Sequence, residues 1–169
     1  MLAYRHTLVK WTGFGAVTLF FLLLQTMVLP RLALWGGYPL TAALAVVCAA
    51  IFTGPWGGGI TGLMCGLMAD AMATPGEAVF ALSFMGAGIL WGLLEKRYFQ
   101  KTLWAAYLFS TATIVVSKLL YYFIFFYLTG RAAPSVLITA ALPELLWSLA
   151  ALPLVYAPYR LIWIRTKEK

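Results

Sequence analysis

The sequence is poor in the residues that a water-soluble surface requires. Only 10% of its 169 residues are charged, whereas soluble domains carry about 25%. Hydrophobic residues make up 63% of the chain, and the mean hydropathy is +0.91. This composition excludes a soluble globular protein and predicts one integral membrane domain over residues 1–169.

Residues that bind metals or carry out catalysis are also scarce. His6 is the only histidine, and the two cysteines, Cys48 and Cys65, lie apart within apolar segments. A metal site needs several such donors at a set spacing, so we expect none. The sequence contains no Walker A, HExxH or GxSxG motif, and no nucleophile is placed beside a base. We therefore expect no catalytic residues, no cofactor and no enzymatic activity.

Long apolar segments, separated by proline, glycine or charged residues, make up the rest of the chain. They predict an all-α, polytopic transmembrane bundle of about six helices. The second and third segments are short for a hydrocarbon core of about 30 Å. The alternative is therefore five helices, with these two joined in one broken hairpin. The six segments are approximately residues 11–30, 37–53, 57–74, 77–94, 103–128 and 141–163.

The basic residues, which outnumber the acidic ones by 12 to 5, gather at the segment ends. This pattern fits the anionic cytoplasmic face of a lipid bilayer and argues against nucleic acid as a partner. If the N-terminus is cytoplasmic, only Arg31 and Arg131 are outside, and Lys118 lies in the membrane. The positive-inside rule thus predicts that both termini are cytoplasmic. The nine cytoplasmic residues are then Arg5, Lys10, Lys96, Arg97, Lys101, Arg160, Arg165, Lys167 and Lys169.

The segment GPWGGGITGLMCGLMAD places glycines at four-residue steps and ends in a carboxylate. On a helix these positions form one stripe. Glycine weakens a helix, but in lipid it lets neighbouring backbones approach closely. We therefore predict a helix-packing face that serves the chain itself, a homodimer or a partner. Its residues are Gly54, Pro55, Gly58, Gly62, Gly66 and Asp70, with a second pair at Gly88 and Gly92.

Lys118 lies within the fifth segment, where an unpaired ammonium group is costly. Asp70 and Glu144 are expected near the same side of the membrane and are its plausible partners. We predict an intramembrane polar cluster of Asp70, Lys118 and Glu144. It either staples the helices together or has a functional role, and a small membrane enzyme using Asp70 or Glu144 is a further alternative.

Over nearly its whole length the chain resembles the family of the rod shape-determining protein MreD. The resemblance rests on the size, the short basic N-terminus, Pro39 at the start of the second segment and the glycine-rich run. That run is similar to the family's G-P-x-x-G and G-L-x-x-D patterns, with a glycine turn after them. The matching residues are Gly54-Pro55, Gly58, Gly62, Gly66-Leu67, Asp70 and Pro75-Gly76. The chain departs from the family at Leu40, where a polar residue is common, and it lacks an asparagine toward its last helix.

The resemblance implies a non-enzymatic component of the bacterial cell-elongation complex in the cytoplasmic (inner) membrane. Such a protein binds an MreC-like membrane partner, helps to position peptidoglycan synthesis and maintains rod shape. Through that partner it is linked to MreB, a RodA-type glycosyltransferase and a penicillin-binding transpeptidase. The family is also similar in fold to the substrate-binding S-components of energy-coupling-factor (ECF) transporters. A substrate-binding subunit of a vitamin transporter is therefore the alternative function.

Overall fold

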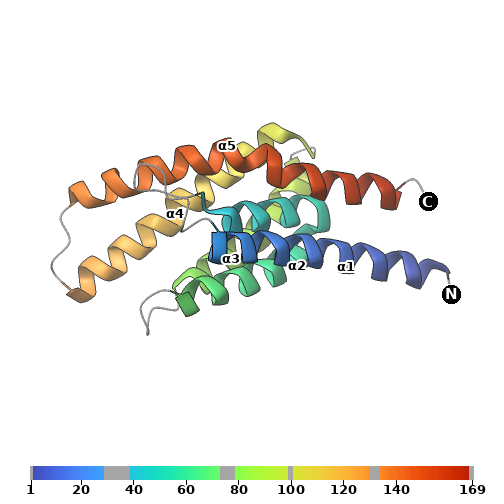
Figure 1. Cartoon of the computed structure of the whole chain (residues 1–169), viewed down its shortest axis with the longest axis horizontal. Helices are drawn as coiled ribbons and strands as arrows, with labels where there is room; N and C mark the ends of the chain where they lie inside the picture. The colour runs from blue at the N-terminus through green and yellow to red at the C-terminus, as the bar shows by residue number, and fades with distance from the viewer. Residues whose placement is uncertain (1, 29–38, 73–78, 99–100, 130–133, 168–169) are drawn as a thin grey trace.

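The computed structural model describes residues 2–28, 39–72, 79–98, 101–129 and 134–167. In this part of the chain five helices are long and apolar enough to cross a membrane. This result confirms the all-α prediction and indicates a multi-pass membrane protein. The helices are α1 (Leu2–Leu23), extended by the π-helix η1 (Leu24–Val28), then α2 (Thr41–Met72), α3 (Val79–Tyr98), α4 (Leu103–Thr129) and α5 (Pro134–Lys167) (Figure 1).

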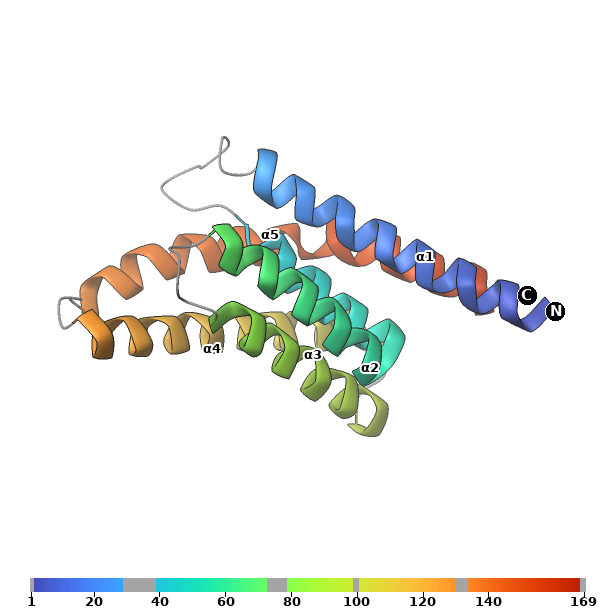
Figure 2. The same cartoon turned by 90° about the horizontal axis from the view of Figure 1, so that it is seen from below.

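Helix α2 contains the chain break that the sequence predicts at Gly54-Pro55. Gly54 has φ 81° and ψ −170°, a conformation that is available to glycine and strained for other residues. Figures 1 and 2 show that the chain reverses at this point, so that the two halves of α2 run side by side in opposite directions. A Cβ atom added to Gly58 would lie 2.7 Å from the Cβ of Ala50, which shows how closely the halves pack. The predicted second and third segments are therefore joined as a hairpin within α2.

The first half of α2 forms the centre of the bundle. Every residue from 42 to 52 is at most 3% exposed, and α2 contacts α1, α3, α4 and α5. This half has apolar residues on all sides, mostly alanine and valine, which is typical of a helix buried all round. Its small side chains let the surrounding helices approach closely.

The other segments surround this central helix and present apolar side chains outward. In the second half of α2, for example, Trp56, Ile60 and Met64 are 83%, 55% and 57% exposed, and their four-residue spacing places them on one face. Figures 1 and 2 place the start of α1 and the end of α5 at the same end of the molecule.

Several predicted boundaries differ from the structure. Helix α3 continues through the charged residues 95–97 to Tyr98, because Lys96 and Arg97 in its last turn interact favourably with the helix dipole. Helix α5 begins at Pro134, well before residue 141, since proline is well tolerated in the first turn of a helix. The predicted breaks at residues 30–31 and 74–76 lie outside the described residues.

Candidate functional site

The glycine stripe of α2 is packed against α3. A Cβ atom added to Gly58 would lie 2.5 Å from the carbonyl oxygen of Gly88. At Gly62 and Gly66 an added Cβ would collide with the backbone of Phe84 and Ala81 respectively. Because neither backbone can rotate away like a flexible side chain, these positions require glycine for close helix contact.

The second glycine pair completes the same contact from α3. A Cβ atom added to Gly88 would collide with the backbone of Gly58, and one added to Gly92 would lie 2.5 Å from the nitrogen of Pro55. Gly92 therefore packs against the hairpin turn at Gly54. Of the roles that the sequence left open for this face, the structure shows packing within the chain, and α3 occupies the surface that a partner would need.

Asp70 caps the beginning of α3. Its two carboxylate oxygens accept hydrogen bonds from the backbone N–H groups of Phe80 and Ala81, at 2.9 and 2.8 Å. The first N–H groups of a helix have no partner within the helix, and they favour a negative charge. Asp70 thus connects the end of α2 to the start of α3.

Lys118 of α4 forms an ion pair with Glu144 of α5, with 2.7 Å between Nζ and Oε2. The side chains are 24% and 10% exposed, so the pair is largely withdrawn from the surroundings. Of the two partners expected for Lys118, the structure therefore selects Glu144. The predicted cluster of three is corrected accordingly, because both carboxylate oxygens of Asp70 bond to α3.

Two polar side chains that sequence reasoning missed secure the start of the central helix. The Gln25 carbonyl oxygen accepts hydrogen bonds from the Thr41 hydroxyl and the Ala42 N–H, at 3.0 and 2.5 Å. The Ser148 hydroxyl accepts a bond from the Leu40 N–H at 2.8 Å. A helix that begins inside an apolar bundle needs such acceptors for its unpaired N–H groups. Isolated polar residues in apolar segments were the signal that could have found them.

Two pairs of aromatic residues join helices α3 and α4. Trp91 stacks on Phe109, with ring centroids 4.6 Å apart, and donates a hydrogen bond to the Thr113 hydroxyl at 2.7 Å. Farther along the helices, Phe80 stacks on Tyr121 with a centroid distance of 5.6 Å. These pairs set the register between α3 and α4.

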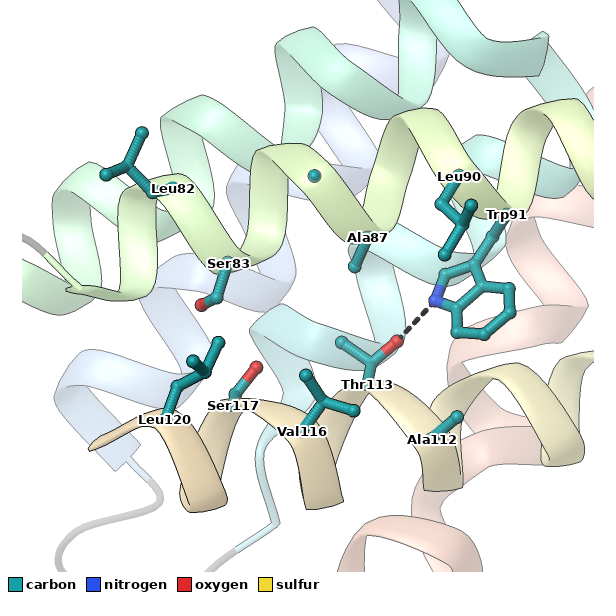
Figure 3. A pocket seen from close by; sticks show the side chains of 11 residues that line it. Leu82, Ser83, Ala87, Leu90, Trp91, Ala112, Thr113, Val116, Ser117 and Leu120 are labelled. Carbon is teal, nitrogen blue, oxygen red and sulfur yellow. Dashed lines mark hydrogen bonds between the residues drawn. The ribbon is translucent and has the colours of Figure 1, made fainter. Parts of the chain in front are cut away.

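Small side chains between the two aromatic pairs leave a groove of about 330 Å³. Figure 3 shows Ser83 of α3 and Ser117 of α4 pointing toward one another across it. A Cβ atom added to Gly86 would meet nothing within 4 Å. The groove is lined by Leu82, Ser83, Gly86, Ala87, Leu90, Trp91, Ala112, Thr113, Val116, Ser117 and Leu120.

The groove opens on the outside of the bundle. Leu82, Leu90, Val116 and Leu120, which line it, are between 40% and 71% exposed, as expected for side chains that face lipid. Sequence reasoning missed this groove. The signal was the sequence Ser83-Phe-Met-Gly86-Ala87, which places small residues three and four positions apart.

Among the residues that the structure describes, no group of three or more histidine, cysteine, aspartate or glutamate side chains could hold a metal ion. Comparison with models of protein families, with curated proteins and with solved structures finds no match. The groove between α3 and α4 is the candidate functional site because it is open to the outside of the bundle and two serine side chains point into it (Figure 3).

Proposed function

We propose that this protein is a non-enzymatic, MreD-like component of the bacterial cell-elongation complex and that its α3–α4 groove binds the membrane helix of an MreC-like partner. The observation that carries the proposal is the groove itself, which combines small residues with two inward-pointing hydroxyls (Figure 3). Small residues let two helix backbones approach, and serine hydroxyls bond across helix interfaces in lipid.

The position of the groove favours a helix over a soluble ligand. Its opening is bordered by exposed apolar side chains, so that its occupant arrives from within the membrane. The Ser83 hydroxyl donates a hydrogen bond to the Phe80 carbonyl at 3.1 Å, and its lone pairs can still accept one. The remaining hydroxyl and indole groups, on Thr113 and Trp91, already bond to each other.

The vitamin-transporter alternative would need several polar groups converging on one ligand. In this groove two serines meet that description, and the other lining side chains are apolar or already paired. The arrangement supports a helix-binding protein better than a vitamin-binding one.

The proposed orientation places both termini in the cytoplasm. Lys96 and Arg97 lie in the last turn of α3, whereas Asp70 of α2 caps its beginning. Basic charge therefore lies at one end of α3 and acidic charge at the other. Arg160 and Arg165 lie near the end of α5, at the same end of the molecule as the start of α1 (Figure 2). The excess of basic residues at this end supports its placement on the cytoplasmic side of the bacterial inner membrane. Links to MreB, a RodA-type glycosyltransferase and a penicillin-binding transpeptidase would then run through the MreC-like partner.

The proposal is tested by co-purifying the tagged full-length protein with the MreC-like protein of the same organism. We expect the wild type to capture it and the Gly86→Leu variant to capture about tenfold less, because a leucine side chain fills the groove. Gly15→Leu is the matched control, since an added Cβ at Gly15 also meets nothing within 4 Å and Gly15 lies on α1.

Two outcomes would contradict the proposal, and each refutes a different part of it. Failure of the wild type to capture the MreC-like protein would refute the proposed function. Capture that is unchanged in Gly86→Leu, or equally reduced in Gly15→Leu, would refute the groove as the binding site.

A further inference from the structure

The end of the molecule at which α1 begins and α5 ends concentrates positive charge. Among the side chains that the structure describes, five of the six basic residues lie here, and Glu95 is the one acid. Lys118, the sixth, is paired with Glu144 in the other half of the bundle. The basic residues at this end are Lys96, Arg97, Lys101, Arg160 and Arg165.

Lys101 is held in place on the surface of α5. The Tyr156 hydroxyl donates a hydrogen bond to the Lys101 carbonyl oxygen at 2.9 Å. The Lys101 ammonium lies over the Trp163 ring, 4.7 Å from its centroid, a favourable cation–π geometry. Phe52 packs against both of these aromatic rings, with centroid distances of 5.2 and 6.0 Å, which anchors them to the central helix.

Arg160 shares this face of α5. It lies four residues after Tyr156 and three before Trp163, and side chains at such spacing lie one above another on a helix. Arg160 itself is exposed. Lys101, which also interacts electrostatically with Glu95, and Arg160 therefore present two cations on the same side of α5. The contacts of Lys101 fix its position.

Exposed tryptophans mark the depth of this pair in the membrane. Trp56 and Trp104 are each 83% exposed. Trp56 comes two residues after the turn at Gly54, and Trp104 three residues after Lys101. Exposed tryptophan is typical of the boundary between lipid and water. The cations therefore lie at the level of lipid head groups.

We propose that Lys101 and Arg160 form a binding site for the phosphate of an anionic phospholipid in the leaflet at this end of the molecule. The argument is charge complementarity at the depth where such phosphates lie. Lys96 and Arg97 add to the positive potential that attracts the head group. This site is separate from the α3–α4 groove and does not depend on the proposed function.

The site is tested by native mass spectrometry of the purified full-length protein with equal amounts of phosphatidylglycerol and phosphatidylcholine. We expect the wild type to retain phosphatidylglycerol preferentially. Each of the two cations that contacts the phosphate should contribute about fivefold to this preference. The double variant Lys101→Gln with Arg160→Gln should therefore show a preference lower by about 30-fold.

Two variants separate specific binding from general charge and from misfolding. Arg165→Gln removes a cation at the same end, five residues from Arg160 and on another face of α5, and should change the preference less than twofold. Lys101→Arg with Arg160→Lys keeps both charges and should keep the preference. Equal retention of the two lipids by the wild type would overturn the proposal, as would an equally large loss in Arg165→Gln.

Discussion

The contact between the glycine face of α2 and α3 leads to a sharp prediction for Gly62→Ala. The added methyl group would collide with the carbonyl group of Phe84 and would lie 2.9 Å from the Cα of Met85. Because these are backbone atoms, α2 and α3 must separate by a distance on the order of 1 Å. A gap of that size removes a quarter to a half of the dispersion attraction across the contact.

The magnitude follows from two opposing effects. Overfilling a packed interior costs about 1–3 kcal/mol, and a collision with backbone belongs near the upper end. Replacing glycine by alanine within a helix returns up to about 1 kcal/mol. We therefore expect Gly62→Ala to lower the free energy of unfolding by about 2 kcal/mol.

Gly86→Ala is the matched control for this effect. It makes the same change on α3, at a position where the added Cβ meets nothing within 4 Å. It should raise the free energy of unfolding by up to about 1 kcal/mol. The two variants should then differ by about 3 kcal/mol, or about 6–12 °C in melting temperature for a chain of this size.

The measurement is thermal unfolding of both purified variants in the same detergent, checked by titration with a denaturing detergent. The order of stability should be Gly86→Ala, then wild type, then Gly62→Ala. Equal melting temperatures for the two variants would refute the close contact of α2 with α3.

Three other predictions concern polar contacts and use the same unfolding assays. Glu144→Gln should destabilise the protein by about 1–3 kcal/mol, because it leaves the Lys118 ammonium without its partner. This loss is below the usual 3–5 kcal/mol for a buried pair, since Lys118 is partly exposed. If the double variant Lys118→Met with Glu144→Leu is no more stable than Glu144→Gln, direct pairing is wrong. Asp70→Ala should cost about 1 kcal/mol through loss of the α3 cap, with Asp70→Asn in between, and an unchanged stability would contradict the cap. Gln25→Leu should cost about 1–3 kcal/mol because it leaves the buried Ala42 N–H without a partner. Gln25→Glu keeps an acceptor and should cost less. Equal losses of stability would argue against Gln25 as the acceptor for this N–H group.

The hairpin at Gly54 shows how far local sequence reasoning reaches. A glycine-proline pair between two apolar segments predicts a break, because proline removes a backbone donor and glycine permits a positive φ. The direction taken after the break is not encoded by these two residues. It follows from the packing of Gly58 against Ala50 and of Gly92 against Pro55, which are contacts between segments distant in the chain.

For the polar residues too, the local sequence predicts a need and contacts between distant segments decide how it is met. The cost of a charge in lipid predicts that Lys118 needs a partner, and Glu144 was one of two available carboxylates. The choice depends on α4 lying beside α5. Asp70 instead binds the backbone of α3, because the end of α2 lies beside the start of α3.

The sequence by itself determined that this protein is a bundle of membrane helices with a break at Gly54 and glycines for close packing. These features follow from transfer free energies and backbone sterics, which act over a few residues at a time. Only the tertiary structure decided that the glycine stripe is covered by α3 and that an open groove lies between α3 and α4. The groove depends on the register between α3 and α4, which the Trp91–Phe109 and Phe80–Tyr121 pairs set. The covered stripe depends on the contact of the α2 glycines with the backbone of α3. Lipid and a neighbouring helix are equally apolar surroundings, so hydrophobicity does not tell a packed face from an open one.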